Sequence, residues 1–337
     1  MLSRSVRVVR RWADVARTSR PSRKPQLWED LPFYIRRRLA YTAATVLAPT
    51  SLDRPRLVRL RSNGVLIEVL PRRYVGQSIF LYGVWEIVGT RLLELLLRPG
   101  MRFIDVGANV GYYTLLAAQC VGSRGRVDSF EPHDALRSML EHGVQANGFT
   151  QIHVRPEAVT ASTGSVALYP FSDVNEGVSS TIAHSATERE GIVVPAISLD
   201  DWLLQHTEGI GSRVDVIKID VEGAELEVFA GMQRLLASPS APSAILFESS
   251  TAGECADVLR SFGYRIMATY YSLGRGLNFI GIDDERTISR LMTDFRGQPT
   301  LDYLALNQVS SADTFDSLAE RSRQRLSWAW RVLRAWT

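Results

Sequence analysis

Strand-like and helix-like segments alternate along most of this 337-residue chain. The strand-like segments are short and rich in Val, Ile, Leu and Phe, and most are followed by a segment whose apolar residues recur with helical spacing. The five clearest strand-like segments are 101–107, 126–132, 153–159, 215–221 and 243–249. Parallel strands need a crossover connection, which is usually a helix, so this alternation predicts an α/β fold with a Rossmann-like, mostly parallel sheet.

Four regions differ in composition and pattern. We expect a basic, partly helical N-terminal extension, then a hairpin with a helix, then the main domain, and last a basic, Trp-rich helix; their bounds are 1–56, 57–98, 99–310 and 311–337. Asn63-Gly64 predicts a two-residue hairpin turn, and the spacing over 225–236 predicts a single helix. The polar, turn-rich segment 160–213 predicts a long substrate-facing loop.

Basic side chains are concentrated at the two ends of the chain. Residues 1–40 hold 11 of the 39 basic side chains and 3 of the 36 acidic ones, which leaves 28 basic and 33 acidic elsewhere. Such an N-terminus fits a solvated arm, a segment on a membrane surface or a mitochondrial transit peptide. We expect a cytoplasmic protein with peripheral contact to the inner membrane face, or to a protein partner, through these ends; mitochondrial import is a minor alternative.

Several classes of protein are disfavoured by the sequence. Cys120 and Cys255 lie far apart without a CxxC motif, so neither a disulfide framework nor a cysteine zinc site is expected. No uninterrupted apolar run is long enough to span a membrane. The mildly acidic main part of the chain, which also lacks an Asn/Asp-Pro-Pro-aromatic motif, disfavours a nucleic acid as substrate.

The sequence FIDVGANVGYYT, residues 103–114, predicts a cofactor site. Its strand ends in Asp105, and Gly107 and Gly111 flank a tight turn into a helix. Glycine lets the backbone approach a ligand, and a helix N-terminus presents free N–H groups. Glu131 ends the next strand, where a carboxylate can accept both hydroxyl groups of a ribose.

Two cofactors fit this motif to different degrees. A dinucleotide motif needs glycine where Asn109 and Tyr112 stand, so a pyrophosphate would be crowded. S-adenosylmethionine has no phosphate and needs partners for its carboxylate, amine, ribose and adenine. We therefore favour S-adenosylmethionine, with Asp105 near the ammonium group and Glu131 on the ribose.

The sequence VIKIDVEGAE, residues 216–225, holds one of only two lysines in the chain, Lys218; the other is Lys24. Alternate side chains of a strand share a face, so Lys218 and Asp220 should point the same way. In one mechanism Asp220 is a general base and Lys218 its electrostatic partner. His184, in the polar segment, is an alternative base.

A second mechanism would use a divalent cation. Asp220, Glu222 and Glu248 could bind Mg²⁺ or Mn²⁺, which would lower the pKa of an acceptor hydroxyl. An alternative explanation of Glu222 and Glu225 is structural, because acidic side chains at a helix start interact favourably with its dipole.

Five separated motifs resemble, in this order, those of the FkbM-type methyltransferases: DVGANVGYYT, FEP, SLDDW, VIKIDVEGAE and ILFE. The resemblance covers about residues 60–270. It implies a class I, S-adenosylmethionine-dependent fold whose mostly parallel sheet has an antiparallel closing strand, and O-methylation of hydroxyl groups on natural products, sugars or glycolipids. It implies cofactor contacts at Asp105, Gly107, Asn109, Gly111 and Glu131, with Gly83 and Glu86 near the methionine end and Glu157-Ala158 near the adenine.

The predicted cofactor site also includes neighbours of these residues, namely Ala108, Pro132 and His133, although His133 is as readily an exposed loop residue. We therefore expect an O-methyltransferase that methylates a hydroxyl of a small molecule, sugar or glycolipid by in-line displacement. The alternatives are a nicotinamide-dependent oxidoreductase, or a membrane- or complex-associated protein that binds the cofactor without turnover. The acceptor is not predicted, because the termini and most of 165–195 lie outside the resemblance. An oligomer is left open.

Overall fold

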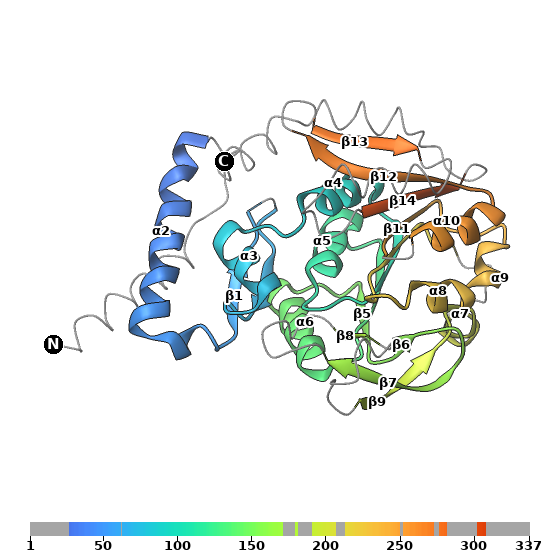
Figure 1. Cartoon of the computed structure of the whole chain (residues 1–337), viewed down its shortest axis with the longest axis horizontal. Helices are drawn as coiled ribbons and strands as arrows, with labels where there is room; N and C mark the ends of the chain where they lie inside the picture. Colours follow the sequence, from blue (N-terminus) through green and yellow to red (C-terminus); the bar gives the residue numbers. More distant parts are fainter. Residues whose placement is uncertain are drawn as a thin grey trace.

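The computed structural model describes residues 27–61, 63–170, 179–180, 191–206, 213–249, 252–272, 276–281 and 302–307. A central sheet has helices on both faces, and each face has its own apolar core (Figure 1). Helices α4 to α6 belong to one core and α7 to α10 to the other. Their bounds are α4 Ile87–Leu96, α5 Tyr112–Val121, α6 Asp134–Asn147, α7 Leu199–His206, α8 Glu225–Ala230, α9 Gln233–Leu236 and α10 Ala252–Ser261.

Eight strands of the described residues form the central sheet, in the order β13-β12-β14-β11-β10-β3-β4-β5. They are β3 Arg102–Val106, β4 Arg126–Phe130, β5 Ile152–Arg155, β10 Val216–Ile219, β11 Ala244–Glu248, β12 Tyr264–Ser272, β13 Gly276–Gly281 and β14 Asp302–Asn307. Neighbours from β11 to β5 are parallel, whereas β14 is antiparallel to both β11 and β12. The predicted α/β fold, with a mostly parallel sheet and an antiparallel closing strand, is confirmed.

The central strands are buried on both faces, because helices cover both. All four residues of β10 are buried, as are the last four of β3. Such strands are normally continuous apolar runs. Asp105 in β3 and Lys218 in β10 are charged residues in these buried strands, and the strand register places them side by side.

Two predicted elements differ from the structure, and one strand was not predicted. Segment 225–236 forms two helices, α8 and α9, on either side of Gly231, where a Cβ would lie 2.1 Å from the backbone oxygen of Thr160. Strand 153–159 is divided at Pro156, which has no N–H to donate, into β5 and β6 Ala158–Val159. Strand β12 was not predicted, because its mixed sequence YRIMATYYS gives no continuous apolar run.

The segment 160–213 is not one long loop. Strands β7 Gly164–Pro170 and β9 Ile192–Ile197 pair antiparallel, and they form a second sheet with β6 and β8 Ser179–Ser180. Alternate residues of these strands face a small apolar cluster. The prediction of a polar loop did not take this alternation into account. Residues 171–178 and 181–190 lie outside the described residues, so a substrate-facing role for them stays a prediction.

Two helices and a hairpin precede α4 in the described part of the chain: α2 Leu27–Leu47, β1 Arg56–Arg59, β2 Leu66–Val69 and α3 Tyr74–Tyr82. The predicted hairpin is present, but its turn is longer than two residues. Leu60 donates its N–H to the carbonyl of Val65, and Gly64 adopts a left-handed φ of 79°. The four regions proposed from the sequence stay predictions, and the predicted C-terminal helix lies outside the described residues.

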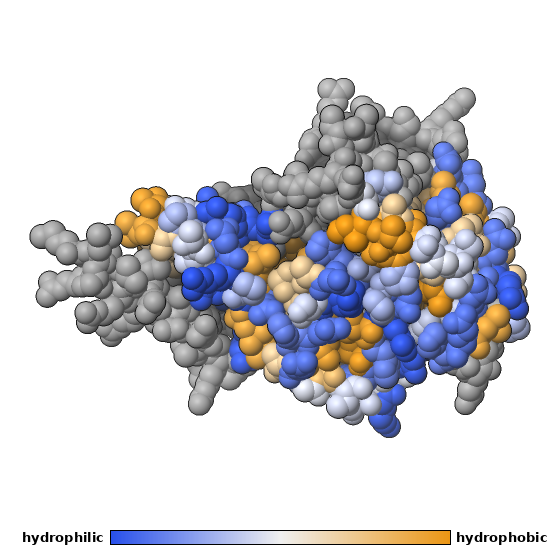
Figure 2. All heavy atoms as spheres, turned by 90° about the horizontal axis from the view of Figure 1, so that it is seen from below, coloured by the Kyte–Doolittle hydropathy of each residue, from blue (hydrophilic) through white to orange (hydrophobic). Residues whose placement is uncertain are grey.

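Helix α2 presents several large apolar side chains to solvent, namely Ile35, Leu39, Val46 and Leu47. Figure 2 shows hydrophilic side chains over most of the face seen from below, with apolar patches between them, one of them on the α2 side. None of the described helices combines the length and the apolar character needed to cross a membrane.

The SLDDW motif anchors α7 against α9. The buried Asp200 carboxylate accepts the N–H groups of Arg234 at 2.8 Å and Leu235 at 2.9 Å, which are unsatisfied donors at the start of α9. Trp202 is fully buried, and its ring centre lies 5.1 Å from that of Phe130. The motif therefore holds the core of this face together.

Replacement of Asp200 by Ala should lower the free energy of unfolding by roughly 2–3 kcal/mol, because two N–H groups lose a charged acceptor. The matched control is Asp201→Ala, whose carboxylate accepts the hydroxyl of Thr163 on the exposed side and should cost less than about 1 kcal/mol. Urea unfolding followed by tryptophan fluorescence measures both values. Equal losses would contradict the anchoring role of Asp200.

Candidate active site

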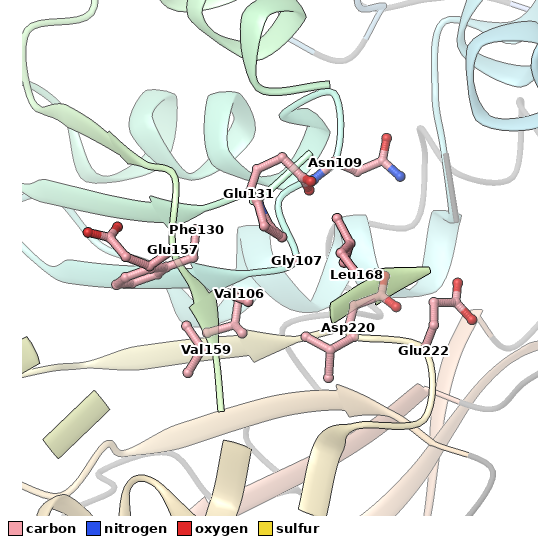
Figure 3. Close-up of a pocket in the computed structure, with 13 residues that line it drawn as sticks. Val106, Gly107, Asn109, Phe130, Glu131, Glu157, Val159, Leu168, Asp220 and Glu222 are labelled. Atoms are coloured by element: carbon pink, nitrogen blue, oxygen red, sulfur yellow. The ribbon is translucent and has the colours of Figure 1, made fainter. Parts of the chain in front are cut away.

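A pocket lies where the carboxyl ends of β3, β4 and β10 meet, next to the point where the strand order reverses (Figure 3). Its hollow measures about 590 Å³ when the solvent-filled mouth is included. Strand ends, the bend between β5 and β6, and β7 supply its lining. The lining residues are Val106, Gly107, Asn109, Phe130, Glu131, Pro132, Glu157, Ala158, Val159, Leu168, Asp220, Val221 and Glu222.

The turn after β3 requires left-handed backbone at three positions. Gly107, Asn109 and Gly111 have φ angles of 79°, 54° and 87°, a region that glycine enters freely and asparagine more readily than most residues. A Cβ on Gly107 would lie 1.9 Å from the backbone oxygen of Asp220. The missing side chain therefore lets the turn lie directly against the end of β10.

Glu131 is buried at the wall of the pocket and holds the glycine turn in place. One carboxylate oxygen accepts the N–H of Asn109 at 2.7 Å and the other accepts the N–H of His133 at 2.9 Å. Burial raises the pKa of Glu131 to about 7, although these two hydrogen bonds oppose the rise. Each oxygen has a further lone pair, so Glu131 can still accept two hydroxyl groups of a ligand.

The two ends of the pocket differ in character. Figure 3 places Phe130 and Glu157 towards one end, and Asp220 and Glu222 towards the other. Apolar strand-end side chains form the first end, which suits a flat ring. A carboxylate oxygen of Glu157 there is buried and lacks a hydrogen-bond partner among the described residues, so it can accept a donor from a ligand.

Asp105 lies behind the glycine turn and is fully buried. One carboxylate oxygen accepts the hydroxyl of Thr114 at 2.6 Å, whereas the other has no hydrogen-bond partner within the described part of the chain. Burial raises the pKa of Asp105, and the positive charge of Lys218 opposes the rise. A buried carboxylate with an unused oxygen is costly, so a positively charged ligand group nearby would stabilise it.

Lys218 and Asp220 form an ion pair at the end of β10. The ammonium of Lys218, which is 8% exposed, donates to a carboxylate oxygen of Asp220 at 2.9 Å. Burial alone would lower the pKa of Lys218, but the negative charges of Asp220, Asp105 and Glu86 outweigh it and raise the pKa. Lys218 is therefore a cation, and 28% of the Asp220 side chain stays accessible from the pocket.

The turn that follows Asp220 contains a strained residue, and the side chain of Glu225 stabilises it. Glu222 has a φ of 52° and Gly223 a φ of 99°. The buried Glu225 carboxylate accepts the N–H of Gly223 at 2.9 Å and the hydroxyl of Ser249 at 2.9 Å. Glu225 thus has a structural role, since it fixes the turn that places Glu222 in the pocket wall.

The structure brings most of the predicted site residues to this end of the sheet. Those that line the pocket are Gly107, Asn109, Glu131, Pro132, Glu157, Ala158, Asp220 and Glu222. Those that are not part of its lining are Glu86, Asp105, Ala108, Gly111, His133 and Lys218. His184, the alternative base, lies outside the described residues.

The three predicted metal ligands are not grouped in the described part of the chain. The described residues contain no group of three or more His, Cys, Asp or Glu side chains arranged to hold a metal ion, so Asp220, Glu222 and Glu248 do not assemble as expected. Asp220 is instead paired with Lys218, which supplies positive charge at that carboxylate.

Six residues of the site were missed in the sequence: Val106, Phe130, Val159, Leu168 and Val221, which line the pocket, and Tyr113, which contacts Lys218. Phe130 and Val159 end strands next to predicted residues, so their position was the available signal. Leu168 belongs to β7, within a segment that was expected to be a loop. Tyr113 stands in the glycine motif itself, but its contact with Lys218 depends on how a helix packs on a distant strand.

Residues 105–266 match the family described as the Methyltransferase FkbM domain. The matched segment, slightly less than half of the chain, contains the glycine turn, Glu131 and the Lys218–Asp220 pair.

The chain is also similar to a methyltransferase that is named for a hexuronic acid. It is 28% identical over 174 residues to the hexuronic acid methyltransferase AglP of Haloferax volcanii. The match covers 49% of this chain and 66% of that protein. Among solved structures, an S-adenosylmethionine-dependent O-methyltransferase from Thermotoga maritima is 14% identical, with a TM-score of 0.39 over 79% of this chain and 83% of that one. The METTL16 methyltransferase domain is 14% identical, with a TM-score of 0.40 over 73% and 74%.

The raised pKa of Glu131 predicts how stability depends on pH. Between pH 4.5 and 7 the folded state binds this proton more tightly than the unfolded state, so Glu131 lowers the free energy of unfolding as pH rises through that window. The effect is about 3 kcal/mol at most. The free energy of unfolding of Glu131→Gln, minus that of the wild type, should therefore rise by up to that amount between pH 4.5 and pH 7. Denaturant unfolding at several pH values measures the difference, and a difference that stays constant would refute the shift.

Proposed function

We propose that this chain is an S-adenosylmethionine-dependent O-methyltransferase that methylates a hydroxyl of a sugar, glycolipid or other small molecule. The excess of negative charge around Lys218 carries the proposal. Asp220, Asp105 and Glu86 all act on this one ammonium group. Three carboxylates around one cation favour a ligand that brings further positive charge. S-adenosylmethionine has a sulfonium and an ammonium group, whereas the pyrophosphate of a dinucleotide is anionic.

The residues of the pocket suit the parts of this cofactor in order. The turn from Gly107 to Gly111 and the unused oxygen of Asp105 would hold the methionine end. Glu131 would accept the ribose hydroxyl groups. The adenine would lie at the apolar end, where the unpartnered carboxylate oxygen of Glu157 can accept a hydrogen bond from the adenine amino group.

In the proposed reaction, Asp220 takes the proton of the acceptor hydroxyl. When bound, the cofactor supplies an activated methyl group. Asp220 stands at the pocket wall and remains partly accessible, as a general base must be. Lys218 orients the Asp220 carboxylate through the 2.9 Å hydrogen bond. Fixed orientation of the base and the acceptor can supply much of the rate enhancement.

A sugar-like acceptor is supported by the similarity to AglP, a hexuronic acid methyltransferase by name. A hexuronic acid carries several hydroxyl groups, any one of which could be the acceptor. A role in glycan or natural product synthesis in the cytoplasm follows from this proposal, and contact with a membrane or protein through the basic ends is proposed on charge alone.

Two alternatives have less support. A nicotinamide-dependent oxidoreductase would need room for a pyrophosphate, but Asn109 occupies one glycine position and the buried Tyr112 another. A protein that only binds the cofactor would not need the accessible base at Asp220 or the buried cation that orients it.

Calorimetric titration of the full chain with S-adenosylhomocysteine tests the cofactor. We expect binding at micromolar or tighter concentration that is equal in EDTA and in magnesium, because the described residues form no metal site. NAD serves as the control and should not bind, since the turn lacks the required glycines. Binding of NAD without S-adenosylhomocysteine would overturn the proposal.

Asp220→Asn should lower methyl transfer to hexuronic acid glycosides about 10²- to 10⁴-fold, because the amide cannot accept the hydroxyl proton. Affinity for S-adenosylhomocysteine should change only about threefold or less, since the asparagine keeps the same size. Radiolabelled methyl transfer and calorimetry measure the two values. The control is Asp257→Asn on the exposed side of α10, which should leave both unchanged. Loss of cofactor affinity in Asp220→Asn would place this residue in the cofactor site and exclude it as the base.

A further inference from the structure

One tyrosine directly after the glycine turn contacts two of the charged groups around the site. Tyr113 is the second residue of α5 and is 5% exposed. Its hydroxyl donates to a carboxylate oxygen of Glu86 at 2.7 Å, and the ammonium of Lys218 lies 4.5 Å from the centre of its ring. Lys218 in turn donates to Asp220 at 2.9 Å. Tyr113 thus joins Glu86 to the Lys218–Asp220 pair.

Helix α4 leaves room for the hydroxyl of Tyr113. Gly89 lies inside this helix, and a Cβ there would be 2.1 Å from the Tyr113 oxygen. The backbone of Gly89 is outside the left-handed region, so its conformation does not require glycine. Glycine inside a helix is destabilising relative to alanine. We attribute its presence at position 89 to the Tyr113 hydroxyl, which leaves no room for a Cβ.

The residue that receives the Tyr113 hydrogen bond is held in a strained conformation. Glu86 has a φ of 34° and stands at the N-cap of α4, yet its side chain makes no capping hydrogen bond. Thr90 supports the same turn, because its hydroxyl donates to the carbonyl of Trp85 at 2.8 Å and lies 2.9 Å from the hydroxyl of Tyr112. Both tyrosines of α5 therefore fix the turn that carries Glu86.

We infer that Tyr113 is a positioning residue for the proposed methyl transfer: its hydroxyl holds Glu86, and its ring holds the ammonium of Lys218 against Asp220. This inference rests on the proposed function. Without the hydroxyl, the Glu86 carboxylate is drawn to Lys218 and competes with Asp220 for it. Without the ring, Lys218 also loses the favourable contact between its charge and the aromatic face. In both cases the base is less well oriented.

The scarcity of lysine allows a direct test of the Lys218 position. In protein labelled with ¹³C-lysine, only Lys24 and Lys218 give side-chain NMR signals, and Lys24→Arg leaves those of Lys218 alone. Protons above an aromatic face are shielded, so the Hε signals of Lys218 should lie upfield of those of free lysine. Tyr113→Phe should keep an upfield shift and Tyr113→Leu should lose it. Tyr264→Phe, which removes another buried tyrosine hydroxyl, one that donates to the carbonyl of Pro242 away from the pocket, is the matched control and should leave the signals in place.

Kinetics separate positioning from a structural role. Tyr113→Phe should lower kcat for methyl transfer to a hexuronic acid methyl glycoside about tenfold, with the affinity for S-adenosylhomocysteine changed by less than about threefold. Glu86→Gln keeps an oxygen that can accept from Tyr113, so kcat should fall less in this variant than in Tyr113→Phe.

Different results overturn the inference and the proposed function. An unshifted Lys218 signal in the wild type, or an equal shift in folded Tyr113→Leu, would overturn the inference. If Tyr113→Leu does not fold, unchanged kcat in Tyr113→Phe, or equal losses of kcat and cofactor affinity, would overturn it instead. Failure of the wild type to bind S-adenosylhomocysteine would overturn the proposed function, while the NMR comparison would still report on Tyr113.

Discussion

A buried ammonium group is the charge on which the candidate site depends. Lys218 is 8% exposed, and the transfer of a cation from water into a protein interior costs several kcal/mol unless it is paired. Asp220 pairs with it directly, and the register of β3 and β10 sets Asp105 beside it. These groups are interdependent, because loss of the lysine would leave two buried or half-buried carboxylates without a counter-charge. The remaining negative charge would favour a positive ligand group at this end of the pocket.

The parallel sheet brings these groups together although they lie far apart in the sequence. Carboxyl ends of parallel strands meet at one edge, and here the edge between β3 and β10 is also where the strand order reverses. Gly107 lets the β3 turn lie against the end of β10, since any side chain there would collide with the backbone of Asp220. The glycine motif therefore does two things: it shapes a wall of the pocket, and it brings the turn after β3 close to Asp220.

Local patterns in the sequence predicted the parts of the structure that depend on local physics. Strand-helix alternation predicted the mostly parallel sheet, and strand periodicity predicted that Lys218 and Asp220 would share a face, which their contact confirms. Features set by tertiary packing were missed or wrong. The break between α8 and α9 depends on the close approach of Thr160 to Gly231. The contact of Tyr113 with Lys218 depends on how α5 packs on the central sheet, which no spacing along the chain reveals.

Backbone strain is concentrated around the site. Among the described residues, the non-glycine residues with positive φ are Glu86, Asn109 and Glu222. Such conformations cost about 1–3 kcal/mol each and persist only where neighbouring contacts fix them. Each has such a contact: a hydrogen bond from Tyr113 to Glu86, one from the backbone of Asn109 to Glu131, and the Glu225 carboxylate beside Glu222. Three polar groups are thereby fixed in the folded chain itself. A ligand that binds there does not have to order them, so the stability lost to strain lowers the free-energy cost of binding and of aligning the reacting groups.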